Sequence, residues 1–284
     1  MTDQAEKLRL KLEKMTKQAK VIAVVSGKGG VGKSTFTLNF ALGLIKQHKR
    51  VLAIDMDIGF GNLDILMGLN SKNTITDVLK GSHSLDDIIE TGPKGISYIG
   101  AGSGLNELTK VEDSSFRSFT EQLEELSESY HYILLDMGAG LTEESLKFIL
   151  SADEVITVCT PEPTSLTDAY SMLKYIPKLG AEVPYSLTVN RVNSKSEGRE
   201  TYLKLKQALQ NFLGKDITHL GNIPHDVIVN KSIINQTPVV LSKPNSKPSQ
   251  AIEKIVTRYL QNGEEVVSDT NESFARKLTR FFKR

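Results

Sequence analysis

The stretch VVSGKGGVGKST, residues 24–35, decides the fold. It contains the pattern GxxxxGK[ST], which begins at Gly27 and ends at Ser34. Glycines let backbone N–H groups turn inward around a phosphate, and the start of a helix adds a favourable dipole. The β-branched run 21–26 before the pattern predicts a strand, and the residues after it predict a helix. The pattern therefore stands in the strand–loop–helix context that phosphate binding requires.

The side chains of this loop suit a nucleoside triphosphate with Mg²⁺. Lys33 can reach the β- and γ-phosphates, the Ser34 hydroxyl can bind Mg²⁺, and Thr35 can hydrogen-bond the α-phosphate. A second lysine, Lys28, precedes Lys33 in the same loop, and the pattern alone gives it no role. The predicted nucleotide-binding residues of the loop are Gly27, Lys28, Gly29, Gly30, Val31, Gly32, Lys33, Ser34 and Thr35.

Short β-branched runs alternate with amphipathic helical stretches across residues 21–262. Continuous apolar strands between such helices are typical of a mostly parallel sheet with helices on both faces. We therefore predict an α/β fold with one domain over 21–262, without an internal boundary or repeat. The predicted strands are 21–26, 51–55, 96–100, 132–137, 154–159, 185–190 and 218–223.

Helical spacing predicts which side chains two of these stretches bury. In the helix after the loop, Phe36, Phe40, Ala41 and Leu44 share one face. Further along the chain, a broader apolar face is expected from Leu203, Leu205, Leu209 and Phe212.

Carboxylates stand at strand ends, where a nucleotide hydrolase needs them. Asp55 and Asp57 end the second predicted strand, and Asp136 ends the run YILLDM. A carboxylate at this position can hold a Mg²⁺-bound water. Gly138 and Gly140 follow Asp136 and allow the loop to move when a γ-phosphate leaves.

Composition excludes several classes of protein. The chain has 284 residues, with Lys+Arg 35 against Asp+Glu 34, so a globally basic nucleic-acid binder is not indicated. The single cysteine, Cys159, cannot form an intramolecular disulfide or a two-cysteine metal or redox site. The start lacks an apolar signal core, and no apolar run approaches the roughly 20 residues of a spanning helix. We expect a cytoplasmic protein that is at most peripheral on the membrane.

Both ends of the chain differ from the predicted domain. Residues 1–20 are charged and helix-prone, with a narrow apolar stripe, and indicate either a solvated arm or a docking peptide for a partner. Residues 263–273 are polar and read as a linker.

The last segment, 274–284, has the pattern of a basic amphipathic helix on an anionic membrane surface. Its apolar face would consist of Phe274, Leu278, Phe281 and Phe282. The alternative is a helix packed on the protein's own core, and the polar linker argues against permanent docking. The cations of the other face are Arg276, Lys277, Arg280, Lys283 and Arg284.

The motifs GKGGVGKS, DMDIGFGNLD and LLDMGAG together resemble the deviant-Walker ATPases, the MinD/ParA group of the P-loop class, over roughly residues 20–260. The resemblance implies a slow, Mg²⁺-dependent ATP hydrolase that forms a homodimer around two ATP molecules. Lys33 would serve its own ATP, and Lys28 would cross to the nucleotide of the second subunit. VNRVN lacks a guanine-reading NKxD signature, which favours ATP over GTP.

The resemblance also implies roles for residues outside the loop. Asp57 would orient the attacking water and Asp136 would lie on the Mg²⁺ side, both reaching the metal through water. The remaining implied roles are Glu162 near the partner's ribose, Asp168 pairing with the incoming Lys28, Asn190 and Arg191 at the adenine, and Pro224 near the base.

Within this group, DQAEKLR resembles the N-terminal DQAxxLR element of FlhG proteins, also called YlxH or FleN. These are MinD-like ATPases that control flagellar number and placement, and their element stimulates the GTPase of the partner FlhF. Gln4 would enter the nucleotide site of FlhF, and Leu8 would anchor the arm. LLDMGAG also fits FlhG better than MinD. The matching residues are Asp3, Gln4, Ala5, Leu8 and Arg9.

Other members of the group remain as alternatives. A MinD-type division-site regulator shares the ATP site and the tail but has no role for DQAEKLR. A ParA-type partition ATPase would bind DNA in a salt-dependent manner, although no specific nucleic acid is expected here. A pure adaptor would use ATP only as a structural clamp. By analogy with MinD, the surface around 164–215 is a candidate docking face for flagellar switch (C-ring) proteins.

Overall fold

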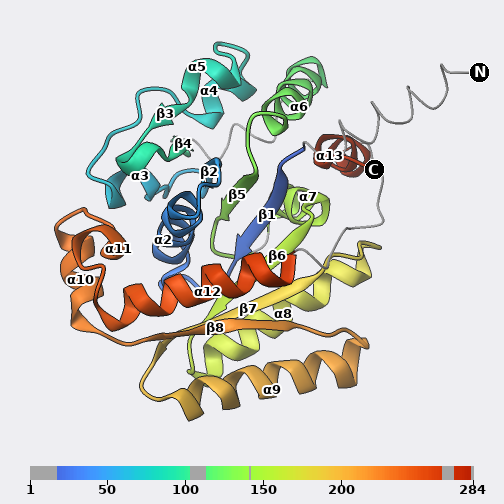
Figure 1. Cartoon of the computed structure of the whole chain (residues 1–284). Helices are drawn as coiled ribbons and strands as arrows, with labels where there is room; N and C mark the ends of the chain where they lie inside the picture. The colour runs from blue at the N-terminus through green and yellow to red at the C-terminus, as the bar shows by residue number, and fades with distance from the viewer. Residues whose placement is uncertain (1–17, 103–112, 141, 264–271, 283–284) are drawn as a thin grey trace, which may run out of the picture.

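An eight-stranded sheet forms the centre of the molecule (Figure 1). In this computed structural model the described residues are 18–102, 113–140, 142–263 and 272–282. The strand order is β3-β4-β2-β5-β1-β6-β7-β8, and every pair is parallel except β3 with β4. The strands are β1 (Lys20–Val25), β2 (Val51–Met56), β3 (Glu90–Thr91), β4 (Ser97–Ile99), β5 (Tyr132–Met137), β6 (Glu154–Cys159), β7 (Tyr185–Val192) and β8 (Thr218–Pro224).

The predicted fold class is confirmed, and each predicted strand is present with its ends within two residues of the predicted ones. The short antiparallel strand β3 was not predicted, because two residues carry no periodic signal. The helices are α2 (Lys33–Lys46), α3 (Leu63–Leu66), α4 (Ile75–Leu79), α5 (Leu85–Ile88), α6 (Asp113–Ser127), α7 (Glu143–Ser151), α8 (Pro163–Lys178), α9 (Lys195–Leu213), α10 (Val227–Ile234), α11 (Val239–Ser242), α12 (Lys247–Gly263) and α13 (Phe274–Phe282), and a 3₁₀ turn covers Pro93–Gly95.

Two apolar layers cover the sheet because successive strand residues point to opposite faces. In β1, Ile22 and Val24 join the layer built with α2 and α12. Val21, Ala23 and Val25 join the opposite layer, which includes residues of α6, α7, α8 and α9. Figure 1 shows α2 and α12 together on one side of the sheet.

Helix α2 buries its predicted face and most of its other sides as well. Phe36 and Phe40 stack with ring centroids 5.3 Å apart, and Phe40 meets the edge of Tyr259 from α12. Ala41 and Leu44 are also buried. The helix that begins at the phosphate loop is therefore held firmly against the sheet.

The broad apolar face predicted for α9 is wrong. Leu205 and Leu209 are fully buried, but Leu203 is 46% and Phe212 is 74% exposed. At 3.6 residues per turn, Leu203 is rotated about 200° from Leu205. Only the stripe at a spacing of four residues reaches the core.

Helix α13 is docked on the domain in this structure, which is the alternative that the sequence left open. It packs against α6 and α7, and Leu278 is 0% exposed. Phe274 and Phe281 are also buried. The Phe282 ring lies 4.0 Å from that of Phe116 and 5.9 Å from that of Phe148.

Polar contacts fasten this helix as well. Lys277, which the sequence placed on the solvent face, is buried and lies 2.8 Å from an Asp153 carboxylate oxygen. Ser273, just before the helix, donates a hydrogen bond to Glu124 of α6. Lys147 lies over the Phe282 ring.

Several predictions about the ends lie outside the described residues. These are the arm residues up to 17, which include DQAEKLR, the linker residues 264–271, and the cations Lys283 and Arg284. Among the described helices, none combines the length and the apolar character needed to cross a membrane.

Candidate functional site

The predicted site residues from 27 to 224 gather at one edge of the sheet. The phosphate loop joins the end of β1 to α2, and β1 lies between β5 and β6. The carboxyl ends of parallel strands meet at the same edge. This edge receives Asp57 after β2, Asp136 in β5, Asn190 in β7 and Pro224 at the end of β8.

Glycines in the loop allow close packing as well as turning. Gly30 has φ +77° and Gly32 has φ +91°, values that side chains rarely tolerate. A Cβ on Gly27 would lie 2.1 Å from a backbone carbon of Asp168, and one on Gly32 would lie 2.4 Å from Nδ2 of Asn190. The loop therefore rests directly on α8 and β7.

The positive charge of Lys33 is neutralised inside the protein by the carboxylate of Asp136. Its Nζ lies 2.7 Å from Asp136 Oδ1, and both side chains are buried. Thr37 donates to the same oxygen at 2.9 Å. Asp136 Oδ2 is buried and has no hydrogen-bond partner in the described part of the chain.

That unpartnered oxygen fits a metal site. A buried polar atom without a partner is costly unless a water or an ion completes it. The hard oxygens of Ser34 and Asp136 lie on either side of Lys33, whose Nζ is 3.4 Å from Ser34 Oγ. These are ligand types that suit Mg²⁺ with retained waters. The residues present thus fit Mg²⁺ with a phosphate.

Asp55 shapes the neighbouring loop rather than facing a ligand. It is buried, and its carboxylate accepts N–H groups of Asp57, Asn62 and Leu63. Strand register sets it beside Asp136. Burial, together with the charge of Asp136, raises the pKa of Asp55 to about 6.

Asp57 is the half-buried carboxylate of that loop. Burial raises its pKa, while the charge of Lys33 lowers it and that of Asp136 raises it further. A Cβ on Gly138 would lie 3.2 Å from Asp57 Oδ1, so the carboxylate lies over the glycine that follows β5. The two loops predicted to respond to a γ-phosphate are therefore in contact.

The three residues predicted at a dimer interface differ in their surroundings. Lys28 is exposed, and its ammonium has no ion pair within the described ranges. Glu162 is exposed beside the start of α8 and accepts a hydrogen bond from the Thr160 hydroxyl at 2.7 Å. Asp168 is half-buried, and its backbone lies against Gly27.

Where the sequence predicts the adenine, Asn190 stabilises the phosphate loop. Its Nδ2 donates to the Val31 carbonyl at 2.8 Å, and its Oδ1 accepts the Arg191 N–H. Arg191 is exposed and has φ +57°. Register pairs Val192 with Pro224, so the predicted adenine residues are neighbours.

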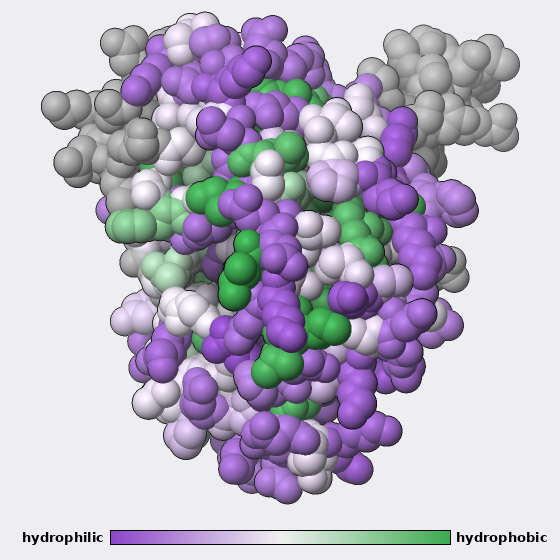
Figure 2. Space-filling model, turned by 90° about the vertical axis from the view of Figure 1, so that its left-hand side faces the viewer, coloured by the Kyte–Doolittle hydropathy of each residue, from purple (hydrophilic) through white to green (hydrophobic). Residues whose placement is uncertain are grey.

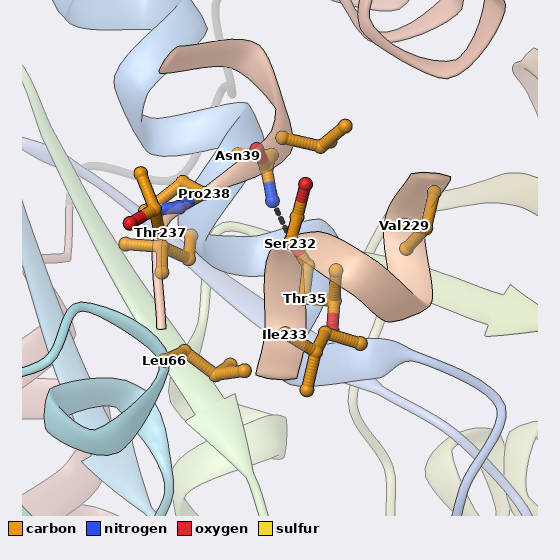
Figure 3. Close-up of a pocket in the computed structure, with 10 residues that line it drawn as sticks. Thr35, Asn39, Leu66, Val229, Ser232, Ile233, Thr237 and Pro238 are labelled. Carbon is orange, nitrogen blue, oxygen red and sulfur yellow. Dashed lines mark hydrogen bonds between the residues drawn. The ribbon is translucent and has the colours of Figure 1, made fainter. Parts of the chain in front are cut away.

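Sequence reasoning missed Asn39, which has no motif to signal it. Its Nδ2 donates to the Thr35 carbonyl at 2.7 Å, and its Oδ1 accepts the Val240 N–H at 3.0 Å. Figure 3 shows it above a small pocket that Thr35, Leu66 and Ile233 also line. The pocket measures about 10 Å³, room for one water at most, so it is no site for a base.

A phosphate loop on the central strand of a parallel sheet, with carboxylates at adjacent strand ends, defines a P-loop nucleoside triphosphatase. The family described as "AAA domain" matches residues 19–189. The chain belongs to the MinD/ParA family of P-loop ATPases.

Comparison with known proteins identifies flagellar regulators among its relatives. The chain is 33% identical to the antiactivator FleN of Pseudomonas aeruginosa, over 84% of this chain and 85% of FleN. It is 32% identical to the flagellum site-determining protein YlxH of Helicobacter pylori, over 92% of this chain and 90% of YlxH. The septum site-determining protein MinD of Pyrococcus horikoshii, solved with Mg-ADP, has a TM-score of 0.72 at 28% identity. That match covers 88% of this chain and 100% of the MinD chain.

Proposed function

We propose that this protein is a Mg²⁺-dependent ATP hydrolase of the FlhG type. It would dimerise around ATP, associate with the inner face of the cell membrane, and regulate flagellar number and placement. The observation that carries the proposal is the contrast between the two loop lysines, Lys33 buried and paired, Lys28 exposed and unpaired among the described residues. The likeness to FleN and YlxH supports the flagellar role.

The two lysines can supply charge from two directions. Lys33 lies at the base of the loop and already faces Asp136, so it can contact phosphate oxygens of its own subunit. The Lys28 side chain is exposed, and no described residue forms an ion pair with it. A cation delivered by a second copy would stabilise charge that develops on the γ-phosphate. Glu162 and Asp168 are then interface residues, and Asp168 would receive the partner's lysine.

Asp57 would position the attacking water. Burial raises its pKa, but a carboxylate remains a weak base, so we expect slow turnover. Ser34 would bind Mg²⁺ directly, and Asp57 and Asp136 would hold its waters. When bound, the metal would neutralise phosphate charge. Asn190, Arg191 and Pro224 would border the adenine.

Exposed apolar side chains near the site support association with another protein surface. Phe60, in the loop after Asp57, is 71% exposed, and Ile65 of α3 is 49% exposed. Ile234 of α10 is 78% exposed. Figure 2 views the side of the molecule that carries α3 and α10, where apolar patches lie among polar residues.

Membrane association would require α13 to leave its docked position against α6 and α7. Phe274, Leu278 and Phe281 are buried by docking, and each is worth about 1.5–3 kcal/mol when buried. The same side chains would be buried again in lipid, so the two states compete closely. Two helices on one dimer raise membrane avidity by about 10²–10⁴, and dimerisation can therefore shift the balance.

The protein partner is proposed from the sequence. The arm with Gln4 and Leu8 would stimulate the FlhF GTPase. Flagellar switch proteins would dock on the face of α8 and α9, where Tyr175 and Phe212 are exposed.

Lipid co-sedimentation tests the function. The full-length wild type and Asp57→Ala are compared with ADP and with ATP, and dimer formation is followed by light scattering. We expect ATP-dependent dimers that pellet with anionic vesicles, and we expect Asp57→Ala to retain them. A protein that stays monomeric with a non-hydrolysable ATP analogue would contradict the proposal.

A further inference from the structure

A second concave surface lies at the edge of the sheet opposite the phosphate loop. Lys20 begins β1, Arg50 directly precedes β2 and Tyr132 begins β5, and these three strands are neighbours in the order β2-β5-β1. Their amino ends border a cavity of about 520 Å³ that is open to solvent. Its lining residues are Gln18, Lys20, Lys49, Arg50, Glu128, Tyr130, His131 and Tyr132.

Backbone hydrogen bonds hold the wall of this cavity in place. The Arg50 N–H donates to His131 Nδ1 at 2.9 Å, and the Arg50 carbonyl accepts the N–H of His131 at 2.9 Å. The same carbonyl accepts the Tyr132 N–H. Arg50 and its neighbour Lys49 are thereby fixed beside the tyrosines without using their side chains.

The charges of the cavity are unevenly compensated. Lys20 is paired with the buried Glu154 at 2.7 Å. Neither Lys49 nor Arg50 has an ion pair to any side chain in the described ranges, and Glu128 is the one acidic residue of the lining. Burial lowers the pKa of His131, and the positive charges of Arg50 and Lys49 lower it further. These two contributions indicate a positive electrostatic potential at the edge of the cavity.

We propose that this cavity binds the phosphate of an anionic lipid headgroup, with Lys49 and Arg50 as its cationic contacts. The inference rests on the proposed membrane association and adds a lipid site on the domain itself. An arginine and a lysine are the side chains that proteins use to bind phosphate. The site lies at the edge away from the phosphate loop and leaves the ATP site free.

The position of α13 favours a lipid over a free anion. Asp153 accepts the Val21 N–H of β1 with one oxygen and binds Lys277 of α13 with the other, so the helix lies beside the start of β1 (Figure 1). Glu124 likewise joins Gln18, in the cavity wall, to Ser273 before α13. A helix released from here enters a membrane that faces the cavity.

The aromatic residues that line the cavity also favour a lipid as the ligand. Tyr130 and Tyr132 each have an apolar ring with a polar end, and such side chains concentrate at membrane–water interfaces. A soluble phosphate has no apolar part to contact them, whereas a lipid has its glycerol and upper acyl chain. The cavity therefore matches a headgroup in both charge and polarity.

A short-chain lipid tests the site without requiring helix release or ATP. Dihexanoylphosphatidylglycerol is titrated below its micelle concentration into the full-length protein and followed by calorimetry, with dihexanoylphosphatidylcholine and inorganic phosphate in parallel. We expect saturable binding of the phosphatidylglycerol. The double variant K49A/R50A should bind it roughly 25-fold more weakly, since each cation near an anionic surface contributes about fivefold. The matched control R199A/K204A removes one arginine and one lysine from α9 and should bind like wild type.

Each result decides the proposal. Equal binding of both lipids, or equal affinity in K49A/R50A and wild type, would overturn it. Equal losses in the two double variants would assign the effect to net charge and overturn it too. Inorganic phosphate that binds as well as phosphatidylglycerol would make this a site for free anions, not for lipid.

Vesicles then separate this inference from the proposed function. If wild type with ATP binds phosphatidylglycerol vesicles and K49A/R50A binds them equally well, only the headgroup site fails. If no form of the protein binds vesicles but the short-chain lipid still binds at the cavity, the ATP-gated membrane switch fails and the site stands. Unchanged ATPase activity of K49A/R50A without lipid shows that the variant is folded.

Discussion

Lys33 and Asp136 form an ion pair of 2.7 Å at the end of the central strands, with Lys33 7% and Asp136 0% exposed. The pair holds the phosphate-binding lysine in place before any phosphate arrives. It also means that each charge is stabilised chiefly by the other. Both properties follow from a strand order that sets β5 beside β1.

Removing the carboxylate should therefore destabilise the whole domain. For Asp136→Ala we expect a loss of about 3–5 kcal/mol in the free energy of unfolding, because a buried lysine is left unpaired. Urea unfolding followed by circular dichroism measures it. Thr37→Ser retains the hydroxyl bound to the same oxygen and serves as the control. A loss below about 1 kcal/mol, the scale of a surface pair, would show that the pair is unimportant for stability.

The exposed lysine should behave in the opposite way. Lys28→Ala removes no contact within the described residues, so we expect wild-type stability and wild-type binding of ADP by the monomer. We expect ATP hydrolysis and ATP-dependent dimerisation to fall by at least tenfold, since the lysine acts on the partner's nucleotide. Nucleotide binding by fluorescence, and phosphate release at several protein concentrations, measure the two effects. A variant that hydrolyses ATP normally would contradict the role of Lys28.

The fold was predictable because its evidence is local. Each central strand is a continuous apolar run, and Gly27 to Ser34 follow the first of them directly. The resemblance assigned the water-orienting role to Asp57, but the local sequence does not explain why Asp55 lacks it, since both are acidic and two residues apart. The structure separates them through the N–H groups of Asn62 and Leu63, which bind Asp55 and leave Asp57 half-buried.

Long-range contacts account for the rest of what the sequence could not predict. An apolar helical face has the same pattern whether it meets lipid or protein, and the groove for α13 is built from Phe116 and Phe148 far away in sequence. The cavity at the opposite edge likewise depends on strand order, because Lys20, Arg50 and Tyr132 are brought together only by the sheet.

The raised pKa of Asp55 predicts a pH dependence of stability. Its pKa rises from 3.8 in the unfolded chain to about 6 in the folded protein. Folding therefore favours the protonated form, and this contribution is fully present below pH 3.8 and is lost as pH rises through about 6. At about 1.36 kcal/mol per pKa unit, the loss is about 3 kcal/mol.

Asp55→Asn should remove this dependence. Its absolute stability will be lower, because an amide cannot replace every hydrogen bond of the carboxylate, but its decline between pH 4 and 6 should be shallower than that of wild type. Denaturant unfolding at several pH values compares the slopes. Parallel curves would show that Asp55 does not titrate in this range.

Docking of α13 predicts that its apolar residues stabilise the protein in the absence of lipid. Leu278→Ala should cost about 2–5 kcal/mol, as for other fully buried leucines, and should lower the melting temperature. Arg276→Ala, two residues earlier on the exposed side of the helix, should have little effect. A melting temperature unchanged by Leu278→Ala would mean that the helix is free in solution.

The N-terminal arm predicts an effect on a partner rather than on this protein. Gln4 is the residue that the FlhG resemblance would insert into the nucleotide site of FlhF, so Gln4→Ala should reduce stimulation of FlhF GTP turnover by tenfold or more. ATP binding should not change, because the arm precedes the domain that carries the loop. Lys7→Ala, at a variable position of DQAxxLR, is the matched control. The measurement is GTP hydrolysis by FlhF with increasing amounts of each variant, and full stimulation by Gln4→Ala would remove the arm from the mechanism.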